Sequence, residues 1–327
     1  MEPVLCRRRF LELAAASSGA LLCGLGAATA APIAAPKTFT YKKAGNLEIK
    51  ADVYRPADNL VRPVAVWIHG GALIMGHRAS VSQRVNDMLL GAGYVVVSID
   101  YRLAPETMLP EIIEDVEDAF RWVREKGPGL FQGDPGQLVV LGGSAGGYLT
   151  LVTGYRVKPR PAVLVSFWGY GDLVGDWYST PSPHERHHQS KMTREEAYRQ
   201  VSGPAVSDAR DRKGDGGAFY QYCRQQGTWP KAVSGWDPRS EVKNFVPYMP
   251  ERNVTKDFPP TILIHGTADT DVPYEQSVLM AQRFKEHGVE HELVTIPGGE
   301  HGLSGGDPKL IDAAYDSSMA FVKRYRR

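Results

Sequence analysis

The sequence predicts an α/β fold, with a mostly parallel central sheet flanked by helices and an inserted, mostly helical cap. Short apolar runs that suit strands buried on both faces of a sheet alternate with segments of helical periodicity. One long stretch, residues 169–258, lacks such runs and interrupts the alternation. A third feature lies within residues 138–150, where an apolar run leads directly into a serine surrounded by glycines.

Each expected element rests on the pattern of its side chains. Residues 39–41 and 47–54 alternate apolar and polar side chains, as strands with one buried face do. Continuous apolar runs predict buried strands at 63–68, 94–99, 138–141, 162–167, 260–265 and 292–296. Helices are expected at 81–90, along the face of Ile112, Val116, Ala119, Phe120 and Val123, along the face of Val278, Ala281 and Phe284, and at 310–325.

The stretch 169–258 is too long for a loop inside a compact domain. We interpret it as a cap over the active site, which divides the core into residues 31–168 and 259–327. Its aromatic side chains could line a substrate pocket or pack the cap onto the core, and packing is the simpler interpretation for any single one of them. These aromatic residues are Trp177, Tyr178, Phe219, Tyr220, Tyr222, Trp229, Trp236, Phe245 and Tyr248.

The first thirty residues have the features of an export signal. Arg7-Arg8-Arg9-Phe10-Leu11 resembles the twin-arginine pattern, an apolar run follows over residues 13–28, and Ala28-Thr29-Ala30 is a small-residue cleavage site. We therefore expect residues 1–30 to direct export to the periplasm or the cell exterior. A retained N-terminal anchor is the alternative, although the run is short for a stable membrane span and rich in Ala and Gly.

The composition excludes some classes of partner. The formal net charge is +1, and 43% of the residues are hydrophobic, as in ordinary globular proteins. No basic stripe is present in the body of the chain, which argues against a nucleic-acid partner. The sequence does not determine the oligomeric state.

Ser144 is the expected nucleophile. It stands in Gly142-Gly143-Ser144-Ala145-Gly146, between an apolar strand and the start of a helix. A serine on such a tight turn has a strained backbone and needs neighbours without bulky side chains. The N–H group of Ala145, at the helix start, is then free to stabilise an oxyanion.

An acid and a histidine follow the serine in the chain, each just after a buried strand. Asp269 follows the strand at 260–265, and His301 follows the strand at 292–296. The carboxyl ends of parallel strands meet at one sheet edge, so Ser144, Asp269 and His301 are expected to form a catalytic triad. Asp271 is the competing acid, but Asp271-Val272-Pro273 is typical of a helix start with Asp271 as its N-cap. We expect His265 to be structural.

The remaining part of the site is an oxyanion hole. His69-Gly70-Gly71-Ala72 directly follows the strand at 63–68, and we assign Gly71 and Ala72, with an uncertainty of one residue, as donors beside Ala145. His69 is expected to shape this loop through hydrogen bonds. The cluster His184, His187 and His188 lacks a framework of further metal ligands, so we interpret it as a solvated part of the cap. Neither a metal nor an organic cofactor is expected.

These motifs resemble the α/β-hydrolase superfamily, and within it the hormone-sensitive-lipase-like and the acetyl-xylan- and feruloyl-esterase-like carboxylesterases. The block Asp100-Tyr101-Arg102-Leu103-Ala104-Pro105-Glu106 and His69-Gly70-Gly71 resemble the lipase-like group. Ala72 and Gly143 depart from that group's usual Gly and Asp, and His265-Gly266-Thr267-Ala268-Asp269 is closer to the prolyl-oligopeptidase and feruloyl-esterase branches. In those branches the matching aspartate is the catalytic acid, which supports Asp269.

The resemblance implies a serine hydrolase that cleaves small or moderate carboxylic esters through an acyl-enzyme. The expected partner is therefore a small-molecule ester. Two alternatives remain open: an exopeptidase with prolyl-oligopeptidase-like chemistry, and a non-catalytic protein that binds ligands on a hydrolase fold. The acyl and alcohol groups are not determined by the sequence.

Overall fold

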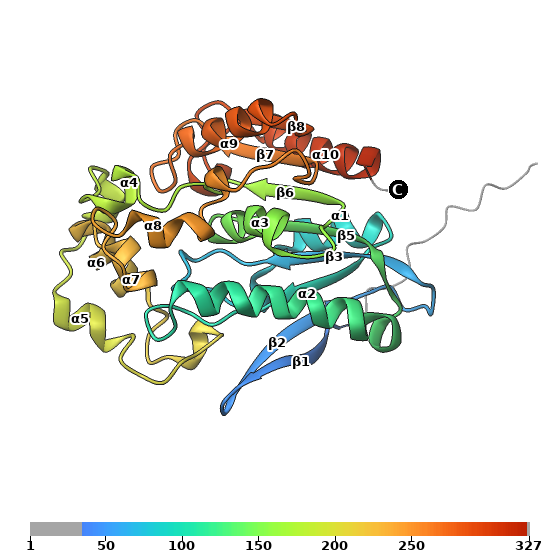
Figure 1. Cartoon of the computed structure of the whole chain (residues 1–327), viewed down its shortest axis with the longest axis horizontal. Helices are drawn as coiled ribbons and strands as arrows, with labels where there is room; N and C mark the ends of the chain where they lie inside the picture. The colour runs from blue at the N-terminus through green and yellow to red at the C-terminus, as the bar shows by residue number, and fades with distance from the viewer. Residues whose placement is uncertain (1–34, 326–327) are drawn as a thin grey trace, which may run out of the picture. The chain divides into compact units, whose positions relative to one another are not determined.

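The computed structural model describes residues 35–325, and these residues contain one eight-stranded sheet. The strand order is β1-β2-β4-β3-β5-β6-β7-β8 (Figure 1). The strands are β1 (Lys37–Ala44), β2 (Leu47–Tyr54), β3 (Arg62–Ile68), β4 (Val95–Ile99), β5 (Gly133–Gly143), β6 (Val163–Phe167), β7 (Thr261–Gly266) and β8 (His291–Ile296). This arrangement confirms the expected α/β fold with a mostly parallel sheet and flanking helices.

The sheet is antiparallel only at its N-terminal edge. β1 pairs with β2 and β2 pairs with β4 in antiparallel registers, while every later pair is parallel. The parallel strands β5, β7 and β8 consequently end at the same edge of the sheet. The loops that follow them carry the predicted serine, acid and histidine.

Alternate side chains of each buried strand enter two separate cores. Along β3, Val64, Val66 and Ile68 belong to one cluster, whereas Ala65 and Trp67 belong to the other. The first cluster is covered by α2 (Leu109–Phe131), α3 (Ala145–Arg156) and α9 (Glu275–Glu286), and the second by α1 (Gln83–Gly91) and α10 (Pro308–Tyr325). This burial on both faces explains why the strands are continuously apolar in the sequence.

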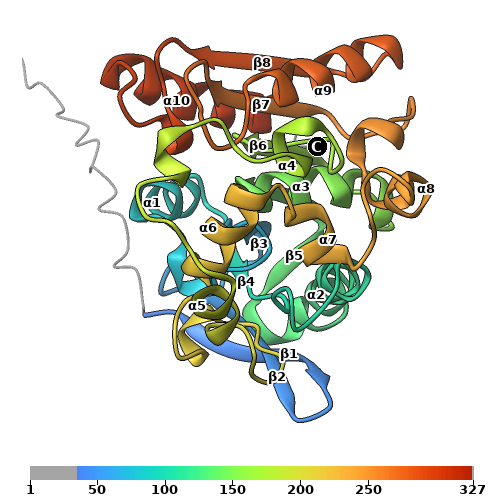
Figure 2. The same ribbon diagram turned by 90° about the vertical axis from the view of Figure 1, so that its left-hand side faces the viewer.

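The segment between β6 and β7 is made of short helices. These are α4 (Asp176–Ser179), α5 (Arg194–Arg199), α6 (Gly217–Gln226), α7 (Trp229–Ser234) and α8 (Val242–Phe245), with 3-10 turns between them. In Figures 1 and 2, α4 to α7 lie beyond the carboxyl ends of the parallel strands. The helices do not form a separate compact unit, since they cluster with the sheet in one body.

The predicted face of α9 is partly wrong. Met280 and Phe284 are buried, but Val278 is 41% exposed, and the buried side chains beside Met280 are the polar Gln276 and Ser277. The polar pair is buried because each side chain has a partner: Gln276 accepts two backbone hydrogen bonds, and Ser277 bonds His265. Within residues 35–325, no helix has both the length and the apolar character needed to cross a membrane. The predicted export signal lies outside the described residues.

Candidate active site

Ser144 occupies a sharp turn between β5 and α3. Its φ and ψ are 57° and −124°, a strained combination for a residue with a side chain. Its N–H donates to the carbonyl of Phe167 at 2.9 Å, which fixes the turn. A Cβ on Gly146 would lie 2.0 Å from the carbonyl oxygen of Ile68, so only glycine allows α3 to start this close to β3.

Ser144, His301 and Asp269 form a continuous chain of hydrogen bonds. Nε2 of His301 lies 3.1 Å from Oγ of Ser144, and Nδ1 of His301 lies 2.8 Å from Oδ2 of Asp269. Both distances suit transfer of the serine proton to the imidazole, with the carboxylate orienting the ring. The three residues that the sequence singled out are therefore brought together by the loops after β5, β7 and β8.

Asp269 is held as a carboxylate by four donors. Oδ1 accepts the N–H groups of Asp271 and Val272, at 2.9 and 2.8 Å, and Oδ2 accepts from His301 and from Nε2 of His265 at 3.2 Å. Burial alone would raise the pKa of Asp269, but these hydrogen bonds lower its pKa to about 2. His265 is fully buried and also bonds Ser277, so it has the structural role expected for it.

His301 is a stronger base than a free histidine. Burial lowers its pKa, but the hydrogen bond to Asp269 and the charges of Asp271 and Asp269 outweigh burial, and the net pKa is raised. The side chain keeps 16% of its surface exposed, so its ring remains accessible beside Ser144.

The loop after β3 lies against the serine turn. A Cβ on Gly70 would lie 2.8 Å from the carbonyl oxygen of Gly143 and 3.2 Å from Cβ of Ser144. Gly71 and Ala72 both have positive φ, 108° and 56°, and this bend turns the chain back tightly enough for the carbonyl of Gly71 to accept two N–H groups. Among the described residues, no acceptor receives the N–H groups of Gly71, Ala72 or Ala145, so these three predicted donors remain free.

Cap residues hold this loop in place. Nε1 of Trp229, in α7, donates to the carbonyl of Ala72 at 2.9 Å, and Arg212 donates to the carbonyl of Ile74. Arg212 is also paired with Glu106, at 3.0 Å between Nε and Oε1, and both side chains are almost fully buried. The sequence analysis did not identify Trp229 or Arg212 as parts of the site. Their partners lie more than 100 residues away in the chain, so no local pattern marks them.

His69 shapes the same loop without proton chemistry. Its ring stacks on Tyr101 with centroids 4.2 Å apart, and Nδ1 lies 2.7 Å from the carbonyl oxygen of Gly70. Burial lowers the pKa of His69 to about 4, so it is neutral at pH 7. The hydroxyl of Tyr101 donates to the His69 carbonyl, which adds a second tie between the loop and the core.

Two expectations about this region are wrong. Asp271 is not a helix N-cap, because α9 begins at Glu275 and is preceded by Tyr274. His187 is not solvated either: it is 2% exposed, with Nδ1 at 2.7 Å from Ser182 Oγ and Nε2 at 2.9 Å from Asp271 Oδ1. The hydrogen bond between His187 and Asp271 allows both side chains to be buried. The two residues are 84 positions apart, so no local sequence pattern indicates that they pair. Within residues 35–325 no group of three or more His, Cys, Asp or Glu side chains could hold a metal ion.

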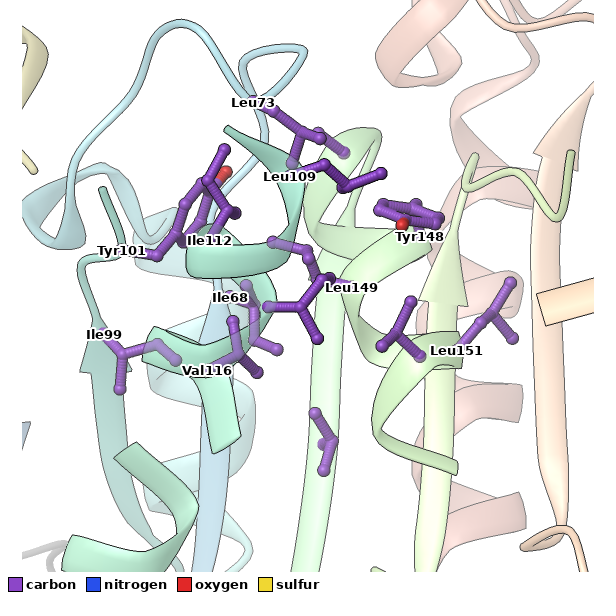
Figure 3. Packing of buried hydrophobic residues seen from close by; sticks show 14 of the residues in the cluster. Ile68, Leu73, Ile99, Tyr101, Leu109, Ile112, Val116, Tyr148, Leu149 and Leu151 are labelled. Atoms are coloured by element: carbon purple, nitrogen blue, oxygen red, sulfur yellow. The ribbon is translucent and has the colours of Figure 1, made fainter. Parts of the chain in front are cut away.

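Most cap aromatics pack against one another. Trp177, Tyr178 and Trp229 form a stack, with centroid distances of 3.6 and 3.9 Å. Phe219, Trp229 and Phe245 are fully buried. Figure 3 shows the core beneath the loops, where Leu73 of the loop after β3 lies beside Leu109. Packing therefore accounts for the burial of these aromatics.

A sequence profile described as the α/β hydrolase fold matches residues 65–304, and the chain therefore belongs to that family. Among curated proteins it resembles the non-reducing polyketide synthases adrD of Penicillium rubens (30% identity over 81% of this chain) and Preu3 of Preussia isomera (26% over 81%). The chain spans only 12% of the length of each.

Solved structures share the fold. An α/β-hydrolase superfamily protein from Enterococcus faecalis has a TM-score of 0.70 and 22% identity, covering 88% of this chain and 98% of its own. A truncated carbohydrate esterase from gut microbiota has a TM-score of 0.64 and 22% identity, and the match covers 88% of this chain and 97% of the esterase chain. Esterase 2 of Thermogutta terrifontis, phosphoramylated by tabun, has a TM-score of 0.63 and 22% identity, and the match covers 89% of this chain and 94% of the esterase chain. At such identities the similarity concerns the fold.

Proposed function

We propose that this protein is a serine hydrolase that cleaves carboxylic esters through an acyl-enzyme. The observation that carries the proposal is the hydrogen-bonded chain Ser144–His301–Asp269, placed beside a loop with free N–H donors. The esterases among the structural relatives support the choice of ester over other acyl substrates. No step requires a metal or an organic cofactor.

The geometry supports the following sequence of steps. His301 accepts the proton of Ser144 through Nε2, and the serine oxygen attacks the ester carbonyl. The N–H groups of Gly71 or Ala72 and of Ala145 stabilise the tetrahedral oxyanion. The imidazolium, oriented by Asp269, then donates its proton to the leaving alcohol. Water, activated by His301, hydrolyses the acyl-enzyme and restores the serine.

Hydrolysis of p-nitrophenyl esters from acetate to decanoate tests the proposal, with Ser144→Ala as the matched variant. Activity that peaks at short acyl chains and disappears in the variant supports a serine carboxylesterase. A fluorophosphonate label on Ser144 without ester cleavage would favour the exopeptidase alternative, and absence of both would favour a non-catalytic binding protein.

We further propose that residues 1–30 export the protein to the periplasm or the cell exterior. The arginine pair before Phe10 and the apolar run after it support this proposal. Replacement of Arg7 and Arg8 by lysine is expected to retain the protein in the cytoplasm, as cell fractionation would show. Unchanged export of that variant would contradict a twin-arginine route.

A further inference from the structure

A second carboxylate lies near the catalytic histidine, at the ring nitrogen that Asp269 does not bind. Oδ2 of Asp271 lies 3.6 Å from Nε2 of His301, the nitrogen that also contacts Ser144 at 3.1 Å. Asp271 is not needed to orient the ring, because Asp269 already binds Nδ1. The mechanism above therefore leaves Asp271 without a role, although it lies next to the atom that protonates the leaving group.

The two oxygens of Asp271 have different surroundings. Oδ1 accepts hydrogen bonds from the Tyr220 hydroxyl at 2.5 Å and from Nε2 of His187 at 2.9 Å. Among residues 35–325, the cationic or histidine nitrogens near Oδ2 are only Nε2 of His301, at 3.6 Å, and a guanidinium nitrogen of Arg186, at 3.9 Å. The cap thus fixes the carboxylate through one oxygen and leaves the other directed at the reacting nitrogen. The Asp271 side chain also retains 11% exposure.

Asp271 is ionised, and its charge is incompletely neutralised. Burial acts to raise its pKa, but His187, His301, Arg224 and Tyr220 together hold its pKa well below the usual range. Arg186 is also bound to Glu300, at 2.7 Å, and is thus shared between two carboxylates. The carboxylates of Asp269 and Asp271 and the guanidinium of Arg186 act on the ring of His301, and the guanidinium of Arg224 acts on Asp271, while burial keeps His187 neutral by lowering its pKa. Beside Nε2 of His301, the negative charge of Asp271 is therefore offset only in part by Arg186, which is 3.9 Å from Oδ2 and is shared with Glu300.

We propose that Asp271 is a specificity-determining residue, which selects esters by the charge of their alcohol part, favouring cationic and rejecting anionic alcohols. The inference rests on the proposed ester hydrolysis. The leaving oxygen must come within hydrogen-bond reach of Nε2, so it lies no more than about 7 Å from Oδ2. A charge on the next atoms of the alcohol is then close enough to the carboxylate for an appreciable Coulomb energy.

The experiment compares acetylcholine with its neutral isostere 3,3-dimethylbutyl acetate, and both with an acetate ester of an anionic alcohol. In the wild-type protein we expect kcat/KM to be about tenfold higher for the cationic ester than for the neutral ester, and lower again for the anionic ester. Asp271→Asn preserves the shape and an acceptor for Tyr220, and it should reduce both ratios to about one. Asp312→Asn removes an exposed carboxylate on α10 that pairs with Arg84, and it should leave the ratios unchanged.

A pH profile separates this role from a merely structural one. Loss of the Asp271 charge lowers the pKa of His301, so the acid limb of kcat/KM for the neutral ester should move to lower pH in Asp271→Asn. Equal rates for the cationic and neutral esters in the wild-type protein would overturn the inference while leaving the esterase proposal intact, and this result does not depend on the variant folding. If the wild-type protein hydrolyses none of the esters, the proposed function fails and the inference fails with it.

Discussion

Replacing Trp229 by phenylalanine would remove one hydrogen bond and preserve most of the surrounding packing. The indole N–H donates to the carbonyl of Ala72 at 2.9 Å, and the ring stacks on Tyr178. The phenyl ring retains that stack, but the buried Ala72 carbonyl loses its partner, at a cost of about 1–3 kcal/mol in the free energy of unfolding. Because the N–H group of Ala72 is also an expected oxyanion donor, the same loss should loosen the residue whose N–H group must bind the tetrahedral intermediate.

We therefore expect Trp229→Phe to lower kcat for a p-nitrophenyl ester by about tenfold to a hundredfold, less than complete loss of one oxyanion donor. KM should change little, because the oxyanion forms only after the substrate is bound. Trp177→Phe is the matched control, since Trp177 belongs to the same stack and its indole N–H has no hydrogen-bond partner among the described residues. Urea titration of both variants separates stability from catalysis. An unchanged kcat in a folded Trp229→Phe protein would refute the assignment of the Ala72 loop as part of the oxyanion hole.

Three further predictions concern the triad and the cap. Asp269→Asn should reduce kcat by about 10⁴-fold, because the amide no longer holds the required imidazole tautomer; a stopped assay on p-nitrophenyl acetate measures this, and near-normal turnover would exclude Asp269 as the acid. Since the pKa of His301 is raised and the base must be neutral, kcat/KM should fall with decreasing pH through a pKa above 6.5, and a plateau down to pH 5 would contradict that. Glu106→Gln leaves the charge of the buried Arg212 unpaired and should cost about 3 kcal/mol of stability by urea titration, whereas a loss below 1 kcal/mol would show that the pair is replaceable.

The sheet and the triad were predictable because the relevant signals are local. A strand buried on both faces requires apolar residues at successive positions, and β4 has five buried residues in a row. The serine turn requires glycines where Gly142 and Gly146 approach neighbouring backbone atoms. Asp269 and His301 each follow such a strand directly, so the parallel topology alone brings them to the same edge as Ser144. Their catalytic roles remain predictions until the variants are measured.

The remaining parts of the site depend on contacts that no local pattern records. Asp271 precedes Val272-Pro273, a pattern typical of a helix start, but the carboxylate instead binds His187, 84 residues away, and Tyr220, 51 residues away. A histidine in a polar run is usually solvated, and only the long-range pairing with Asp271 makes burial of His187 favourable. The lack of buried-strand runs shows that residues 169–258 interrupt the sheet, but no local pattern assigns these residues to partners in the core.

Those partners show that the cap is an integral part of the site. Four loops build the site, and the cap binds three of them through different residues. Trp229 bonds the loop after β3, His187 and Tyr220 bond the loop after β7, and Arg186 bonds Glu300 beside His301. Trp229, His187 and Tyr220 are buried. Opening of the cap would break their hydrogen bonds before water could replace them, which makes such a movement costly. Changes in the cap should therefore alter the geometry of catalysis, because its side chains hold three of the loops that form the site.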